Sequence, residues 1–339
     1  MSSLIPVSPE RWKLCVAPML EWTDRHCRYF HRLLTKHALL YTEMVTTGAL
    51  LHGDVARHLH YNDEEHPLAL QLGGSEPTDL AQCAKLGEQW GYDEINLNCG
   101  CPSERVQRGA FGVCLMAEPQ LVADCVKAMV DQVQVPISVK HRIGIDQSDS
   151  YDFVRDFVGT VSTAGCSTFI VHVRNAWLQG LSPKENRTVP PLRYDWAHRL
   201  KKDFPALTIV VNGGITSTAQ VLDQLEHVDG VMVGREAYHN PWWLSQWDAA
   251  FYRAGSTNLT CDQVEEQMVT YMERAAVEHG TPWPGIARHM LGLRRGLGGA
   301  RHWRQVWSDH KLKEFSPRQV MVQAHAPDCC TSNSSVGKL

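Results

Sequence analysis

The sequence predicts an α/β fold, a (β/α)8 TIM barrel followed by a small all-helical C-terminal domain. Eight short apolar runs recur along the first 235 residues, and helix-like segments separate most of them. A strand followed by a helix, repeated eight times over about 235 residues, is typical of this barrel. Several runs are continuously apolar, which indicates parallel strands covered on both faces.

The expected strands are Leu14–Pro18, Leu39–Val45, Pro67–Leu72, Glu94–Asn98, Ile137–Lys140, Thr168–Val173, Leu207–Asn212 and Gly230–Gly234. The clearest helices between them are Asp24–His37, Pro77–Trp90, Pro119–Val133, Tyr151–Ala164 and Thr218–Leu225. A doubly wound open sheet is the alternative. It would need a different loop at its switch point, and here the first strand ends in Pro-Met-Leu without a glycine fingerprint.

The strand signal stops after about Tyr238. We therefore expect a catalytic barrel over residues 1–245, a helical domain over 246–325 and a disordered polar tail over 326–339. The expected helices of the second domain are Gln263–His279, Ile286–Arg295, Ala300–Asp309 and, more weakly, Pro317–Ala324.

The charge is distributed unevenly along the chain. The whole chain carries −4, but Thr281–Arg318 has eight Lys or Arg and two Asp or Glu, a net +6 that leaves −10 elsewhere. A localised basic stretch of this kind is typical of a face that contacts phosphates. A solvated helix surface is the alternative interpretation.

Several classes of protein are disfavoured. The N-terminus lacks a signal-peptide pattern, and no window approaches the roughly 18 apolar residues of a membrane span, so we expect a soluble cytoplasmic protein. No Cys-x-x-Cys pair occurs among the eleven cysteines, so we expect no bound metal. Separately, we expect the protein to be a monomer. The cysteines that fall in apolar patterns, where they should behave as small hydrophobes, are Cys15, Cys27, Cys83, Cys125 and Cys166.

Polar or otherwise distinctive residues close nearly every apolar run. Barrel enzymes place their active site at the carboxyl ends of the strands, so these residues should line one mouth. They are Pro18, Met19, Leu20, Glu43, Met44, Gln71, Asn98, Lys140, His172, Asn212, Gly213, Gly214, Gly234 and Arg235.

The last two strand ends predict a phosphate site. Asn212-Gly213-Gly214 follows the seventh run and Gly234-Arg235 the eighth, where barrels often bind phosphate through backbone N–H groups. Two tight turns are the alternative. Lys140 could form a Schiff base or hold an anionic cofactor edge, whereas His172 fits a core residue equally well.

Cys101 is the candidate reactive residue. It lies just past the fourth strand between Gly100 and Pro102, on a stiff loop suited to an acid or a nucleophile. Cys99 should point the other way. Gln71 can both donate and accept hydrogen bonds, which suits the edge of a flavin or a pyrimidine.

The motifs together resemble one family. The segments that carry the resemblance are APMLEWTDRHCRYF, LLYTEMVTTGAL, ALQLGGSEP, EINLNCGCPSERVQRGAFGVCLM, SVKHRIGID, LSPKENR, VNGGI and DGVMVGREAYHNP. They resemble the tRNA-dihydrouridine synthases, most of all the bacterial A subfamily, over residues 14–310.

The resemblance implies an FMN-containing barrel and a C-terminal RNA-binding domain. In the implied reaction NADPH reduces the flavin, which reduces D-loop uridine of tRNA to 5,6-dihydrouridine.

The resemblance also implies roles for individual residues. Hydride would reach uracil C6, and Cys101 matches the proton donor to C5. The positions that match FMN-binding segments are Pro18, Met19, Leu20, Gln71, Lys140, His172, Asn212, Gly213, Gly214, Gly234 and Arg235. The positions that match tRNA contacts are Asn98, Lys184, Arg187, Arg301 and Arg304. Cys99 is a departure, because relatives often carry an apolar residue there.

Two other functions are compatible with a barrel of this kind. A small-molecule FMN reductase of the dihydroorotate or enoate type would need no basic helical module. A catalytically inactive RNA-binding barrel would not need to retain the cysteine and the cofactor residues.

Overall fold

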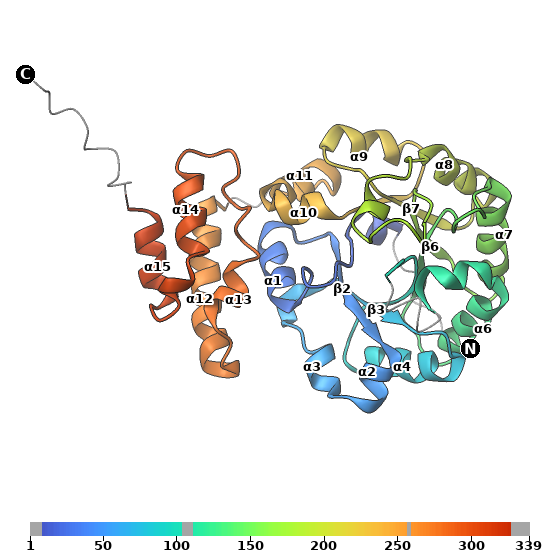
Figure 1. The fold of residues 1–339 in the computed structure, drawn as a ribbon, viewed down its shortest axis with the longest axis horizontal. Coiled ribbons are helices and arrows are strands. Elements are labelled where there is room, and N and C mark those ends of the chain that lie inside the picture. The colour runs from blue at the N-terminus through green and yellow to red at the C-terminus, as the bar shows by residue number, and fades with distance from the viewer. Residues whose placement is uncertain (1–8, 104–110, 256–258, 327–339) are drawn as a thin grey trace, which may run out of the picture.

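The computed structural model describes residues 9–103, 111–255 and 259–326. Within them, eight parallel strands close into a barrel in sequence order, which confirms the predicted fold class (Figure 1). The last strand pairs with the first, with Val233 opposite Val16. The strands are β1 Leu14–Val16, β2 Leu39–Thr46, β3 Leu68–Gly73, β4 Glu94–Cys99, β5 Ile137–Arg142, β6 Thr168–His172, β7 Thr208–Asn212 and β8 Gly230–Val233.

Helices surround the barrel on its outer side (Figure 1). The α-helices of this part are α1 Arg25–Leu34, α2 Thr47–His52, α3 Val55–Leu59, α4 Pro77–Gln89, α6 Pro119–Val130, α7 Tyr151–Ser162, α8 Tyr194–Asp203, α9 Thr218–Leu225, α10 Arg235–His239 and α11 Trp247–Phe251. The 3-10 turns are η1 Pro9–Trp12, η2 Asp63–Glu65, η3 Gly112–Ala117, η4 Glu185–Arg187 and η5 Pro241–Gln246. Helix α8 was not among the clear predictions, because its polar sequence buries only Ala197 and Leu200.

The alternation of side chains along β4 separates the barrel interior from the outer core. Ile95, Leu97 and Cys99 belong to the large apolar core that the helices cover. Glu94, on the opposite face, accepts hydrogen bonds from the Trp12 indole at 2.5 Å and the Tyr41 hydroxyl at 2.8 Å. The bottom of the barrel is therefore closed by a satisfied buried carboxylate. Cys99 points away from the mouth, as predicted, because successive side chains of a strand alternate.

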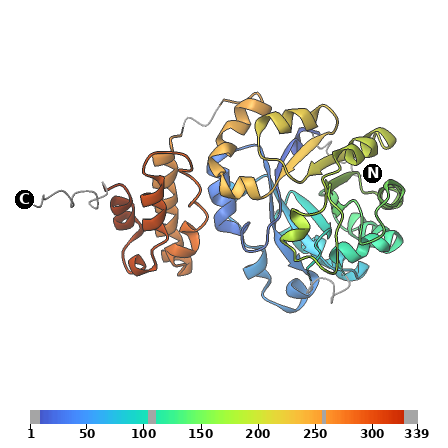
Figure 2. The ribbon, with the colours of Figure 1, turned by 45° about the horizontal axis from the view of Figure 1, so that its top comes forward.

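The C-terminal region is a separate group of helices beside α1 and α10 (Figures 1 and 2). It contains α12 Cys261–His279, α13 Trp283–Ala287, α14 Ala300–Trp307, η6 His310–Leu312 and α15 Pro317–Ala324. The Thr260 side chain caps α12 at its start, and Gly280, with φ of 63°, ends it.

The contact between the two regions is polar and aromatic. The Tyr271 ring stacks on Tyr29 with centroids 3.9 Å apart. Asp24, which caps α1, accepts hydrogen bonds from Arg288 at 2.8 Å and His289 at 3.0 Å. This contact fixes the helical region against the loop that follows β1.

The predicted helix Ile286–Arg295 is wrong beyond Ala287, where α13 ends and a series of turns begins. Gly292 lies against the backbone of His239, whose carbonyl oxygen a Cβ would approach to 2.7 Å. Gly296 has φ of 83°, which a helix does not permit. The segment forms turns because it packs against the barrel.

The predicted disordered tail, 326–339, lies outside the described residues apart from Ala326. No helix among the described residues has both the length and the apolar character needed to cross a membrane. The five cysteines predicted to be buried are buried.

Candidate active site

A cavity of about 1330 Å³ opens at the carboxyl ends of the strands. Every residue predicted to bind a cofactor lines it, together with Cys101, Asn98 and Arg187. The prediction that the strand ends meet at one mouth is confirmed. The predicted cofactor residues in the wall are Pro18, Met19, Leu20, Gln71, Lys140, His172, Asn212, Gly213, Gly214, Gly234 and Arg235.

Gln71 and Asn98 form a fixed polar pair on neighbouring strands. The Asn98 amide donates to Gln71 Oε1 at 2.9 Å, and the Gln71 amide donates to Asn96 Oδ1 at 2.7 Å. Asn98 Oδ1 in turn accepts from the backbone N–H groups of Gly100 and Cys101, both at 3.0 Å. Asn98 therefore sets the conformation of the loop that carries Cys101.

Cys101 and Cys99 lie in opposite environments. The Cys101 side chain is partly exposed in the cavity wall, with its Sγ 3.5 Å from Ser103 Oγ. The Cys99 side chain is fully buried in the apolar core, and burial raises its pKa well above the usual range. Of these two thiols, only Cys101 faces the cavity.

Lys140 and His172 are partly buried basic side chains in the same wall. Burial, aided by the charge of Arg142, lowers the pKa of Lys140 to about 7. Burial and the same arginine lower the pKa of His172 well below its usual range, so its imidazole is neutral. Within the described part of the chain, neither the ammonium nor the imidazole has a hydrogen-bond or ion-pair partner.

The two positions after β7, Gly213 and Gly214, have backbone angles and close contacts that disfavour any residue with a side chain. Gly213 and Gly214 have φ of 121° and 72°. A Cβ on Gly213 would lie 2.9 Å from the His172 ring, and one on Gly214 would lie 2.6 Å from Leu192. No backbone acceptor in the described residues takes the N–H of either glycine. These N–H groups can therefore serve a ligand.

Arg142 is a site residue that the sequence reasoning missed. It lines the cavity at the end of β5, although its side chain is almost completely buried. Lys140 and Arg142 are two residues apart and so lie on the same face of the strand. That spacing of two cations at the end of an apolar strand was the available signal.

The residues predicted to contact RNA fall into two places. Asn98 and Arg187 line the cavity, and exposed Lys184 precedes η4 in the loop after β6. Arg301 and Arg304 lie on α14, in the helical region, and are not part of the cavity wall. The structure does not bring these two groups together.

Five of the eight basic residues of the stretch Thr281–Arg318 are engaged in ion pairs within the protein. Lys313 pairs with Glu314 at 3.8 Å. Acidic partners hold Arg288, Arg294, Arg295 and Arg318 in ion pairs. Arg301 and Arg304 are exposed and have no ion-pair partner among the described residues. The cationic surface open to a ligand is therefore smaller than the sequence count suggested.

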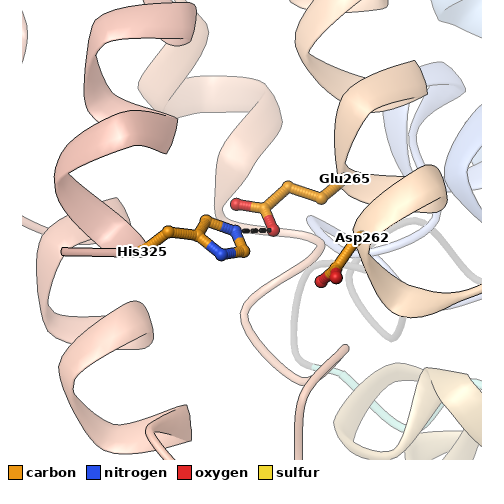
Figure 3. Close-up of side chains that lie close together, drawn as sticks. All are labelled: Asp262, Glu265 and His325. Carbon is orange, nitrogen blue, oxygen red and sulfur yellow. Dashed lines mark hydrogen bonds and ion pairs between the residues drawn. The ribbon is translucent and has the colours of Figure 1, made fainter. Parts of the chain in front are cut away.

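Asp262, Glu265 and His325 come together in the helical region, with potential ligand atoms within 4.8 Å of one another (Figure 3). The Arg294 guanidinium reaches all three, at 2.8 Å from Glu265 and 3.2 Å from His325. A positive charge already compensates this cluster, so it is not a candidate metal centre.

Comparison with known proteins identifies the family. The family model described as "Dihydrouridine synthase (Dus)" matches residues 15–326. A solved complex of 2-naphthoyl-CoA reductase with 2-naphthoyl-CoA has a similar fold, with a TM-score of 0.53 and 10% identity over 69% of this chain and 49% of that one.

Curated relatives match over nearly their whole length. The chain is 56% identical to the tRNA-dihydrouridine(20/20a) synthase of Vibrio parahaemolyticus, over 93% of this chain and 96% of that protein. It is 56% identical to the enzyme of the same name from Escherichia coli K12, over 92% and 90%. The chain therefore belongs to the dihydrouridine synthase family of enzymes, as its motifs indicated.

Proposed function

We propose that this protein reduces uridine to 5,6-dihydrouridine at positions 20 and 20a of the tRNA D-loop, in the cytoplasm, with bound FMN and with NADPH as electron donor. One observation supports the chemistry above all others. The cavity gathers two basic groups that have no partner among the described residues, Lys140 and His172, in the same wall as Cys101, whose backbone N–H Asn98 holds.

The residues of the cavity fit FMN. A partly buried ammonium and a neutral imidazole without protein partners suit the electron-rich edge of a flavin ring. Among the described residues no acceptor takes the N–H groups of Gly213 and Gly214, and Arg235 begins α10 directly after β8, with its guanidinium 3.2 Å from the Arg187 carbonyl oxygen. Backbone N–H groups with an arginine beside them form a suitable cradle for the cofactor phosphate.

FMN, when bound and reduced by NADPH, supplies the hydride that reaches C6 of uracil. Cys101 then acts as the general acid and donates its proton to C5. Asn98 keeps Cys101 in place through two backbone hydrogen bonds, and also holds Gln71. Because the cavity is recessed at the barrel mouth, the target base has to leave its stack to enter it.

The tRNA would contact both regions. Arg187 lines the cavity and exposed Lys184 lies three residues before it in the loop after β6, so both can meet phosphates close to the target uridine. Arg301 and Arg304 are presented by α14 and can meet a more distant part of the same RNA. Such contacts orient the RNA without reading its sequence.

Two measurements test this function. The purified protein should show a flavin absorbance band and release FMN on denaturation. With NADPH it should form dihydrouridine in tRNA that lacks this modification, whereas dihydroorotate and simple enoates should not be turned over. Flavin without tRNA turnover would favour a small-molecule reductase, and neither flavin nor turnover would favour an inactive barrel.

A matched pair of glycine variants tests the phosphate cradle. Gly213→Ala places a Cβ 2.9 Å from the His172 ring, whereas Gly48→Ala meets no atom within 4 Å. The first variant should purify largely without flavin and the second with full flavin, both with the circular dichroism of the unmutated protein. Full flavin in Gly213→Ala would contradict the phosphate assignment.

A further inference from the structure

Arg142 connects two loops of the barrel mouth. Its Nε donates to the Gly100 carbonyl oxygen at 3.0 Å, in the loop after β4. Its Nη1 donates to the carbonyl oxygens of Asn175 at 3.1 Å and Asn186 at 2.9 Å, in the loop after β6. One side chain therefore joins the two loops from between them.

Each loop carries a group that the reaction needs. Gly100 immediately precedes Cys101, so the carbonyl that Arg142 holds belongs to the peptide unit whose N–H Asn98 also holds. Asn186 immediately precedes Arg187 in the cavity wall. The position of Cys101 is thereby tied to the position of the rim that would meet RNA.

Hydrogen bonds cross-link the loop after β6 at the residue that Arg142 holds. The Asn186 side chain accepts from the Trp177 N–H at 2.8 Å and donates to the Trp177 carbonyl oxygen at 2.8 Å. These bonds close the loop on itself beside the point where Arg142 is attached. Arg142 therefore joins Cys101 to an ordered segment.

Burying the charge of Arg142 to make this connection costs free energy of desolvation. Its side chain is 2% exposed, and no carboxylate pairs with it in the described residues. Burial lowers the pKa of Arg142 to about 10, with the thiol of Cys101 acting in the opposite direction, so the guanidinium stays charged at neutral pH. Buried charges ordinarily have a counter-charge, so a solitary one beside the reactive thiol requires an explanation beyond packing.

We propose that Arg142 is a positioning residue for Cys101. It holds the proton-donating loop in register with the RNA-facing loop, so that the thiol meets C5 of the uridine that the rim has oriented. This inference rests on the proposed function, in which Cys101 is the proton donor. It assigns to Arg142 an effect on turnover that passes through Cys101.

A double-mutant cycle tests this coupling. Arg142→Lys keeps the charge but cannot span three carbonyl groups, and a displacement of about 1 Å at a reacting group can cost on the order of 10²-fold in rate. We expect Arg142→Lys to slow single-turnover dihydrouridine formation by on the order of 10-fold to 10²-fold. In the Cys101→Ala background the same change should alter the residual rate by less than about 2-fold, because the group that Arg142 positions is absent.

Arg174→Lys is the matched control. Arg174 lies in the same loop and donates to the Pro190 carbonyl oxygen, but it has no bond to Cys101 or to the other described residues of that loop. Its effect, whatever the size, should be the same in both backgrounds. Flavin content, NADPH oxidation and tRNA affinity are measured for every variant, and Arg142→Gln replaces Arg142→Lys if the latter loses its flavin.

The outcomes are distinguishable. Loss of the Arg142 effect in the Cys101→Ala background supports the positioning role. Equal effects in both backgrounds would show that Arg142 supports the barrel in general, and would overturn this inference while leaving the proposed function intact. An unchanged rate in Cys101→Ala alone would overturn the proton-donor assignment itself.

Discussion

The barrel mouth and the helical region both contain buried charges, but they satisfy them in opposite ways. In the helical region the fully buried Glu265 carboxylate accepts from Trp303 at 2.7 Å and Trp307 at 2.8 Å. Arg294 and His325 also donate to it, both at 2.8 Å. Every oxygen of this carboxylate is thus occupied by the protein itself.

At the mouth the arrangement is incomplete. The Lys140 ammonium and the His172 imidazole have no partner in the described residues, and Arg142 is bonded only to carbonyl oxygens. Buried polar groups are nearly always satisfied, so groups left open in a cavity indicate a ligand. The difference is that protein donors saturate the Glu265 carboxylate, which suits a role in maintaining the fold, whereas Lys140 and His172 at the mouth remain available to a ligand.

The largest expected effect concerns Cys101 at the barrel mouth. Cys101→Ala should keep FMN binding and NADPH oxidation but lose on the order of 10²–10⁴-fold in dihydrouridine formation, because the general acid is gone. Mass spectrometry of nucleosides from treated tRNA measures the loss. Cys99→Ala, whose thiol is buried behind the strand, is the control and should be nearly silent. The reverse pattern would mean that the wrong thiol has been assigned.

The second prediction concerns the completed network. Glu265→Leu leaves two buried indole N–H groups without an acceptor and removes one of the two carboxylates that pair with the partly buried Arg294, which should cost about 3–5 kcal/mol of the free energy of unfolding. Denaturant or thermal unfolding measures this loss, while turnover well below the transition should persist. The neighbouring Glu266→Leu, which removes only an exposed ion pair with Arg318, should shift unfolding far less. Equal losses of unfolding free energy in the two variants would mean that the buried contacts of Glu265 stabilise the fold no more than the exposed ion pair of Glu266.

A third prediction uses the pKa of Lys140, which burial lowers to about 7 in the free protein. An electron-rich flavin edge favours the protonated amine and therefore raises this pKa on binding. As pH rises above about 7, the free protein loses the proton that the complex retains, so FMN affinity should fall by up to about tenfold per pH unit. Reconstitution of apoprotein with FMN between pH 6 and pH 9 measures the slope.

Lys140→Arg provides the control for that titration. Its guanidinium stays charged throughout, so its FMN affinity should lack this decline, while ionisation of the cofactor phosphate affects both proteins alike. The same slope in the two proteins would place the flavin edge away from Lys140.

The sequence predicted the features that depend on local pattern. The strand runs were found within one or two residues, because the apolar segments end where the polar mouth begins. The alternation along Glu94–Cys99 was enough to direct Asn98 to the mouth and Cys99 outwards, whereas Cys101 was assigned to the mouth because it lies on the loop just past the end of the strand. The set of residues that line the cavity followed from the rule that barrel sites lie at the carboxyl ends of strands.

Features that depend on contacts distant in sequence could not be predicted. The helix expected from Ile286 to Arg295 is replaced by turns because Gly292 packs against His239. Arg142 looked like a strand residue, and its role depends on carbonyl groups of two loops. The count of positive charges also overstated the open basic surface, since pairing with acidic side chains elsewhere is invisible in a linear sequence.

The last and smallest effect concerns those positive charges. Arg301 and Arg304 are three residues apart on α14, so they share one exposed face of the helix. In contrast, Arg295 pairs with Glu236 at 3.4 Å and Arg318 with Glu266 at 2.5 Å. Of these two pairs, only Arg301 and Arg304 lack an ion-pair partner among the described residues, so we expect them to replace counterions on the RNA when it binds.

Arg301→Ala with Arg304→Ala should therefore weaken tRNA binding and lower the slope of log affinity against log salt by about two units, with flavin reduction by NADPH unchanged. Arg295→Ala with Arg318→Ala removes the same formal charge and should leave the slope nearly unchanged, because those side chains are already neutralised within the protein. A salt titration of tRNA binding by both double variants shows whether the slope depends on arginines without an ion-pair partner or on the total formal charge. If both variants lowered the slope equally, tRNA binding would depend on the total charge of the helical region. The difference between paired and unpaired charges would then not apply to this surface.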